Sequence, residues 1–277
     1  MMILLQTGVA EAGYSRSGEY LGLGGVVYPS TFHIQPDGSV LVDYGGFEAI
    51  NPTTTAQVGL SRHGVWVRTG DRRALADARR AARWLVRAQA PDGGWRYEFP
   101  WQVGDVEQLQ PGWISAIAQG QAISLLTRLH AVTGRRAFLR AARRAVRPFR
   151  VGVRRGGVRR RAFGGPWFEE YPTTAGPSLV LNGAMFGLLG LYDVAPYNRA
   201  AARLFERGMD VLGGALPAYD LPGGWSLYAI ATEHGRPWVA PVPYHRWHVT
   251  LLRVLDSLRP DRRLRVFADR WAAGLPS

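Results

Sequence analysis

Apolar and polar positions along most of this chain recur with the period of an α-helix, and they do so in four similar units. The units begin near Pro52, Gly112, Pro177 and Tyr244, roughly 65 residues apart. Each unit is long enough for two helices joined by a short turn. The pattern therefore predicts four repeated helical hairpins.

The second helix of each unit is predicted to be amphipathic. Its apolar positions follow a three- and four-residue spacing, as in Leu75, Ala78, Ala82 and Leu85. Arginines occupy the remaining face, which predicts an outer helix with one side in solvent. A turn residue precedes each of these runs, near Thr69, Thr133, Pro196 and Pro260.

The first helices have a different pattern, being apolar almost all round and rich in small residues. Residues 113–123 and 179–191 are the clearest examples. Such helices are typical of a buried, closely packed layer. We therefore predict a mainly α fold, an α/α toroid or incomplete barrel of about four helical hairpins whose inner helices ring a cleft. An open α-solenoid is the structural alternative.

Residues 1–50 alternate with a period of two, which predicts strands. Segments 26–28 and 32–34 lead through Asp37-Gly38 into segment 40–44, as in a β-hairpin. We expect a short β-rich segment over 1–50 and an α/α-barrel catalytic domain over 51–277. The hairpin is too small to fold alone, so it should pack on the helical domain or on a second subunit, which allows for a homodimer.

Three loops between the hairpins repeat a Gly-Gly turn followed by aromatic residues, at 93–98, 164–171 and 223–228. This pattern predicts short extended hairpins at one rim of the ring, with their tyrosines around one opening. The tryptophans of these loops have a structural alternative, because Trp95, Trp167 and Trp225 could equally pack the repeats together.

The segment from Trp167 to Thr174 concentrates two carboxylates, a phenol and two aromatic rings. Pro172 favours extended geometry at the residue before it, so side chains should alternate between two faces. On that basis Glu170 should point away from Glu169 and Tyr171. The composition predicts a reaction site that faces a sugar.

Composition narrows the chemistry and the partners. The 277 residues contain no cysteine, which excludes disulfides, thiolate zinc sites and cysteine nucleophiles. All 34 basic residues are arginine, and the formal net charge of +13 favours an anionic partner. Most arginine runs lack the aromatic interleaving of single-strand binders, so we expect solvated helix faces and no nucleic acid. The exception is 159–161, a basic stretch that could guide a polyanion into a cleft.

The first residues make a poor export signal. Residues 1–5 form only a short apolar stretch without a basic region before it. No segment reaches the length of a membrane span. These features predict a cytoplasmic protein without stable membrane insertion.

Four stretches in order resemble the catalytic domain of the D-glucuronyl C5-epimerases, which convert glucuronate to iduronate within heparan-type polymers. They are 113–122, 167–174, 181–183 together with Gly190-Leu191-Tyr192-Asp193, and Tyr244-His245-Arg246-Trp247-His248. The resemblance implies an isomerase with a helical barrel preceded by β-structure and an anionic, uronate-containing polysaccharide as its partner.

The resemblance also implies the site residues, with Glu170, Tyr228 and Tyr244 as the catalytic groups. Inversion at C5 needs a base on one face of the sugar and an acid on the other, and it requires no metal or organic cofactor. A tyrosine acting as base would need a cationic neighbour such as Arg246. The candidate substrate-binding residues are Tyr97, Gln119, Trp167, Tyr171, Asn182, His245, Arg246 and His248.

Several of these candidates have two interpretations. Gln119 and Asn182 could be buried structural amides or could contact sugar hydroxyls. The spacing of His245 and His248 is compatible with a metal, but no nearby acid or cysteine completes a ligand set, which favours hydrogen bonding near Tyr244.

The chain departs from the family pattern after Tyr228. The family usually continues as Tyr-Asp-x-Arg-His, whereas this chain has Ala229-Ile230-Ala231-Thr232. Either another arginine, Arg236 or Arg246, binds the substrate carboxylate, or the polymer differs, or activity is lost. A polysaccharide lyase and a non-catalytic glycan-binding protein are the alternative functions, because the fold supports both.

Overall fold

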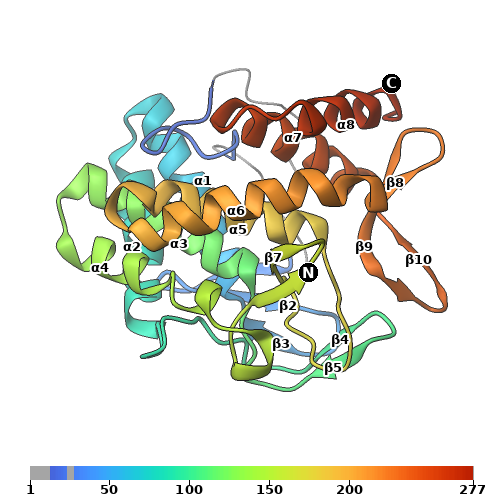
Figure 1. Cartoon of the computed structure of the whole chain (residues 1–277). Helices are drawn as coiled ribbons and strands as arrows, with labels where there is room; N and C mark the ends of the chain where they lie inside the picture. Colours follow the sequence, from blue (N-terminus) through green and yellow to red (C-terminus); the bar gives the residue numbers. More distant parts are fainter. Residues whose placement is uncertain (1–12, 24–27, 277) are drawn as a thin grey trace.

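The computed structural model describes residues 13–23 and 28–276. The predicted strand residues Val26 and Val27, and the opening residues 1–5, lie outside the described residues. The described chain contains four helical hairpins, as the periodicity predicts (Figure 1). Their helices are α1 (Pro52–Thr69) and α2 (Arg72–Ala88), α3 (Ala116–Thr133) and α4 (Arg136–Arg144), α5 (Leu181–Val194) and α6 (Arg199–Ala215), and α7 (Val242–Leu258) and α8 (Arg262–Ala273).

The inner helices α1, α3, α5 and α7 pack one against the next, and α3 and α5 make the most extensive contact. Glycines permit this close approach. A Cβ atom on Gly120 would lie 2.2 Å from the carbonyl oxygen of Phe186, and one on Gly190 would lie 2.4 Å from the Cα of Gly120. Any larger residue would push the two backbones apart, so the small residues of the inner helices fix their spacing.

The outer helices begin and end at the turn residues that the sequence indicates. The side chains of Asp71 and Asp261 each accept a hydrogen bond from the backbone N–H two residues further on, which caps α2 and α8. Gly70 and Gly134 end α1 and α3 in the left-handed conformation, with φ of 72° and 66°. The hairpin boundaries are therefore set locally.

The strands form four small antiparallel sheets, which gather along the lower and right-hand edges of the helical body in Figure 1. Short 3₁₀ helices lie at η1 (Pro148–Arg150), η2 (Val153–Arg155), η3 (Ala195–Tyr197) and η4 (Leu216–Tyr219). The strands are β1 (Phe32–Ile34), β2 (Val40–Asp43) and β3 (Glu48–Ile50); β4 (Trp101–Val103) and β5 (Glu107–Leu109); β6 (Arg159–Ala162) and β7 (Gly165–Phe168); and β8 (Asp220–Leu221), β9 (Trp225–Glu233) and β10 (Arg236–Val239).

The N-terminal hairpin is present and gains a third strand, in the order β1-β2-β3. The sheet packs on the helical body of the same chain, where the Thr55 hydroxyl on α1 accepts a hydrogen bond from the Val40 N–H on β2 at 3.0 Å. Val40, Val42 and Phe32 are buried in the main core. Of the two predicted packing partners, the helical domain and a second subunit, the helical domain is therefore the one that buries this sheet.

Two of the three predicted rim hairpins form where the Gly-Gly turns indicate, between β6 and β7 and between β8 and β9. The first does not. Gly93, with φ of 91°, packs its backbone against the Arg144 carbonyl beside the end of α4, and the hairpin β4–β5 follows only after Trp101. The turn itself is present, because the Gly93 N–H donates to the Ala90 carbonyl at 2.9 Å, but Tyr97 then pairs with Trp113 and not with the chain before the turn.

A buried ion pair ties residues 14–20 to the helical body. Arg128 on α3 donates to Asp193 on α5 at 2.6 Å, and both side chains are fully buried. The same guanidinium donates to the carbonyls of Ser15 and Gly18, while the Tyr14 hydroxyl donates to Asp193 at 2.7 Å.

None of the helices in residues 13–23 and 28–276 combines the length and the apolar character that a membrane span requires.

Candidate active site

Glu170 lies at the centre of a buried polar cluster built from three elements. It follows β7 by two residues, and its side chain is completely buried. The Tyr228 hydroxyl on β9 donates to one carboxyl oxygen at 3.2 Å, and the Asn182 amide on α5 donates to the other at 3.4 Å. Residues separated by up to 58 positions along the chain thus converge on one carboxyl group.

Gly183 makes room for this carboxyl group against the first turn of α5. A Cβ atom at position 183 would lie 2.4 Å from the Cβ of Glu170 and 2.6 Å from its Oε2. No side chain larger than hydrogen fits at that distance. The Asn182-Gly183 pair therefore supplies one hydrogen bond donor and the space for the group that it binds.

Burial dominates the electrostatics of Glu170. Removal of the carboxylate from water, with a smaller contribution from the nearby Glu169 charge, raises its pKa to about 7 against the opposing hydrogen bonds from Tyr171 and Tyr228. A carboxyl group with a pKa near neutrality exchanges a proton readily at physiological pH. That property suits general acid–base chemistry.

Glu169 faces the other way and holds the loop together. Its carboxylate forms a salt bridge with Arg160 on β6 and accepts hydrogen bonds from the Ser178 hydroxyl at 2.8 Å and the Leu179 N–H at 2.9 Å. The opposite orientation of the two glutamates agrees with the predicted alternation. Tyr171 departs from it, because the chain bends after β7 and the Tyr171 hydroxyl hydrogen-bonds with Glu170.

Three tyrosines surround the carboxyl group. Burial raises the pKa of Tyr171 and of Tyr228 well above the ordinary value, and the Glu170 charge raises both further. The rings of Tyr228 and Tyr244 meet edge to face with centroids 5.1 Å apart. Tyr171 and Tyr228 are therefore neutral hydrogen bond donors at neutral pH.

Aromatic residues extend the cluster towards the β1–β3 sheet. Tyr97 stacks on Trp113 with ring centroids 3.9 Å apart, and its hydroxyl lies 2.5 Å from that of Thr53. Next to them is a narrow gap between aromatic side chains that is too small to hold a water molecule. It is lined by Tyr44, Asn51, Tyr97, Phe99, Trp101 and Trp113.

Sequence reasoning did not select Tyr44, Phe99 or Trp101 as candidates. Tyr44 comes from the end of β2, and its ring packs against Phe99 and Trp101 with centroids 5.1 Å and 5.7 Å away. The available signal was the density of aromatic residues between positions 95 and 113. Only the packing of the β-sheet on this loop reveals that Tyr44 joins them.

The two histidines form a buried network outside this cluster. The Nδ1 atom of His245 accepts from the Ser226 N–H at 3.2 Å, so its Nε2–H donates to the Trp271 carbonyl at 2.9 Å. The Ser226 hydroxyl lies 2.7 Å from Nδ1 of both His245 and His248. Burial lowers the pKa of His248 to about 3, so it is neutral, and the network joins β9, α7 and α8.

Gln119 and Trp167 are also held by contacts away from Glu170. The Gln119 amide accepts from the Trp95 N–H and donates to the carbonyls of Gly93 and Ala145. Trp167 stacks on Tyr219 within the main core, with ring centroids 5.8 Å apart. The side chains of Gln119 and Trp167 therefore lie away from Glu170. The predicted candidates that the structure does bring together there are Tyr171, Asn182, Tyr228 and the neighbouring Tyr244.

Neither Arg246 nor Arg236 is buried among the tyrosines in the way the sequence suggests. Arg246 is exposed and follows Tyr244 by two positions on α7, about 200° around the helix. Arg236, on β10, is exposed as well. The Arg160 guanidinium donates to the Glu169 carboxylate and to the carbonyls of Thr173 and Gly176. Arg160 therefore holds the loop after β7 in place.

The described part of the chain holds no group of three or more His, Asp or Glu side chains arranged for a metal ion.

Comparison with known proteins decides the family. A sequence model described as the D-glucuronyl C5-epimerase C-terminus matches residues 89–273, which include every residue of the Glu170 cluster. The chain belongs to the D-glucuronyl C5-epimerase family.

Curated relatives agree with this assignment. The chain is 36% identical over 208 residues to a D-glucuronyl C5-epimerase of Caenorhabditis elegans, covering 69% of this chain and 33% of that protein. It is 31% identical over 140 residues to an uncharacterized protein of Methanocaldococcus jannaschii, covering 48% of this chain and 44% of that protein. The chain therefore spans less than half the length of either relative.

Solved structures share the fold. An unsaturated glucuronyl hydrolase from Bacillus sp. GL1 aligns with a TM-score of 0.54 at 19% identity, over 79% of this chain and 60% of that one. A cellobiose 2-epimerase from Spirochaeta thermophila aligns with a TM-score of 0.57 at 17% identity, over 80% and 57%. These likenesses confirm the α/α-toroid architecture that the repeats predict.

Proposed function

We propose that this protein is a carbohydrate epimerase that inverts C5 of D-glucuronate residues to L-iduronate within a polysaccharide. The observation that carries the proposal is the buried contact between Glu170 and Tyr228, inside the segment that matches the family. This contact joins a carboxyl group with a pKa of about 7 to a phenol whose pKa is raised. The pair supplies two proton-transferring groups of different type.

The directions of these pKa shifts support one distribution of roles. Glu170 is partly ionised at neutral pH, so it is the base that takes the proton from C5, leaving a carbanion stabilised by the adjacent carboxylate of the sugar. The Tyr228 hydroxyl hydrogen-bonds directly to Glu170, so the phenol that returns a proton to C5 from the other face is Tyr244. Tyr228, whose ring packs against that of Tyr244, then relays the proton of Glu170 to the Tyr244 phenolate, which restores both groups.

The remaining candidates act in binding. Tyr171 and Asn182 hold the Glu170 carboxyl group. Tyr97 is buried and supports the aromatic wall, whose partly exposed rings of Tyr44 and Trp101 offer apolar surface to a sugar ring. His245 and His248 act indirectly, by fixing β9 and hence Tyr228. The proposal requires an anionic, uronate-containing polysaccharide and no metal or organic cofactor.

The decisive experiment is NMR of heparosan and other glucuronate polymers incubated with the protein in deuterated water. Deuterium at C5 together with new iduronate signals is the expected result. Chain cleavage with an ultraviolet-absorbing unsaturated product would instead establish a lyase. Polymer binding without any exchange would establish a non-catalytic glycan-binding protein.

Two variants test the assigned groups. Glu170→Gln and Tyr228→Phe should each lower the exchange rate about a hundredfold or more, because each removes a proton-transferring group. The matched controls are Glu206→Gln, an exposed glutamate on α6, and Tyr197→Phe, an exposed tyrosine in η3. Both controls should retain the wild-type rate, and a Glu170→Gln variant with that rate would disprove the assignment.

A further inference from the structure

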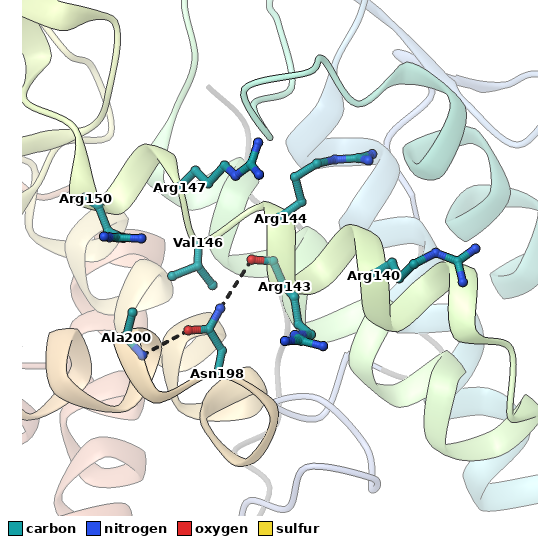
Figure 2. Close-up of a pocket in the computed structure, with 8 residues that line it drawn as sticks. All are labelled: Arg140, Arg143, Arg144, Val146, Arg147, Arg150, Asn198 and Ala200. Carbon is teal, nitrogen blue, oxygen red and sulfur yellow. Dashed lines mark hydrogen bonds between the residues drawn. The ribbon is translucent and has the colours of Figure 1, made fainter.

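A second feature of the molecule lies outside the Glu170 cluster, on the outer layer of helices. A hollow of about 420 Å³ opens between the end of α4 and the start of α6 (Figure 2). It is lined by Arg140, Arg143, Arg144, Val146, Arg147, Arg150, Asn198 and Ala200. Five of these eight side chains are cationic, and none is acidic.

Three of the five arginines have no partner. Among the described residues, the side chains of Arg140, Arg143 and Arg150 make no hydrogen bond or ion pair. Arg144 donates to Gln89 at 2.9 Å, and Arg147 donates to the Pro91 carbonyl at 3.2 Å. Figure 2 shows the guanidinium groups of Arg143 and Arg150 on either side of Val146, with Asn198 close by.

The absence of acids here is a property of the sequence around the hollow. Between Glu107 and Glu169 the chain has thirteen arginines and no aspartate or glutamate. Elsewhere arginines are commonly paired, as in Arg259 with Asp210 and Arg270 with Asp220. Like charges at helical spacing repel one another, so an unpaired cluster of this kind is stabilised by an anion from outside the chain.

The hollow connects to the candidate active site along the chain. The Arg147 side chain and the Gln119 amide hold residues 91–93 and 145 together, at the start of the loop that leads to Tyr97. In the other direction, the exposed residues Arg154 and Arg155 continue from η1 to β6, and β7 leads directly to Glu170. The residues that line the hollow are therefore linked, by these contacts and by the chain, to the segments that carry Tyr97 and Glu170.

We propose that the hollow is an exosite for the carboxylates of an anionic polysaccharide, and that it holds a stretch of the polymer remote from the residue undergoing reaction. The guanidinium group binds carboxylates with paired hydrogen bonds. No aromatic side chain lines the hollow, so it lacks the stacking platform of a single-strand nucleic-acid site. The identity of the polymer as substrate rests on the proposed function.

The test is a binding titration of the whole protein with long heparosan chains and with a short heparosan oligosaccharide. Arg143→Gln/Arg150→Gln should raise the Kd for the long polymer roughly tenfold, because two charge-assisted contacts are lost. The Kd for the short oligosaccharide should stay unchanged. Arg253→Gln/Arg262→Gln, on α7 and α8, removes the same charge from exposed positions away from the hollow and is the control.

Equal weakening in the two double variants would overturn the exosite, since bulk charge would then explain the binding. A loss of affinity for duplex DNA in the hollow variant, with polymer binding intact, would overturn it in favour of nucleic acid. The deuterium exchange experiment stands apart from this titration. Failure of exchange would overturn the proposed function, whereas the titration would still decide whether the hollow binds the polymer.

Discussion

Two adjacent glutamates show how far the surroundings of a residue decide its chemistry. Glu169 and Glu170 are both buried, but Glu169 has a guanidinium, a hydroxyl and a backbone N–H around its carboxylate. Among the described residues, the donors around Glu170 are neutral groups of Tyr171, Tyr228 and Asn182. Burial raises the pKa of both carboxyl groups, but at Glu169 the Ser178 hydroxyl, the Arg160 guanidinium and a backbone N–H oppose the shift, and these same bonds hold the group in place. Glu170, desolvated among neutral groups, is the better proton carrier.

This difference predicts a pH-dependent stability. Burial raises the pKa of Glu170 from 4.5 to about 7, so its contribution to stability is complete below pH 4.5 and is lost as pH rises through about 7. Relative to Glu170→Gln, which does not titrate, the free energy of unfolding of the wild type should fall by about 3 kcal/mol between pH 4.5 and pH 8. Urea unfolding of both proteins across that range measures the difference.

Taking the difference between the two proteins cancels the histidines. His248, whose pKa burial lowers to about 3, destabilises the folded state as pH falls below its ordinary range, and it does so in both proteins. A difference that stayed constant with pH would contradict the raised pKa of Glu170.

At the scale of elements, the site depends on how α5 meets the segment after β7. Gly183 lies in the first turn of α5, where a helix would ordinarily tolerate alanine better than glycine. The proximity of the Glu170 side chain reverses that preference. Helix, loop and strand β9 therefore position the carboxyl group jointly.

Gly183→Ala should disturb the site without removing any of its functional groups. The new methyl group would overlap with Glu170, so the carboxyl group must move away from Tyr228 and Asn182. We expect C5 exchange to fall tenfold or more while the helical content measured by circular dichroism stays unchanged. Gly214→Ala on α6, whose added methyl group would meet only Arg263 at 3.9 Å, is the control and should retain the wild-type rate.

At the scale of the whole molecule, the Arg128–Asp193 pair connects the N-terminal segment to the barrel. One guanidinium bridges α3, α5 and the backbone of residues 15–18. Because both charges are fully buried, removing one of them leaves the other without compensation. The pair therefore links the N-terminal segment to the packing of α3 against α5.

Arg128→Met should lower the free energy of unfolding by about 3–5 kcal/mol, because it leaves Asp193 buried and unpaired. Arg128→Met/Asp193→Leu removes both charges, so it should recover much of that loss. Urea unfolding of the two variants makes the comparison. A double variant less stable than the single one would show that the hydrogen bonds to residues 14–18 matter more than the uncompensated charge.

The sequence by itself determined the repeated architecture of this protein. The helical period, the glycine and aspartate turn residues and the apolar inner helices are local signals, because each depends on neighbours within one or two helical turns. They predict four hairpins, and the structure confirms all four. The hairpin of residues 32–43 and the Gly-Gly turns before Pro166 and Trp225 are local in the same sense.

Only the tertiary structure decided which side chains meet. No local sequence pattern indicates that Gly183 approaches Glu170 or that Tyr44 joins the aromatic wall. Nor does any pattern indicate that the Gln119 amide hydrogen-bonds with backbone groups. These contacts join positions 13 to 55 residues apart, and their energies depend on burial and on the donors that surround each group. A carboxyl group becomes a proton carrier through its surroundings, and those surroundings exist only in the folded chain.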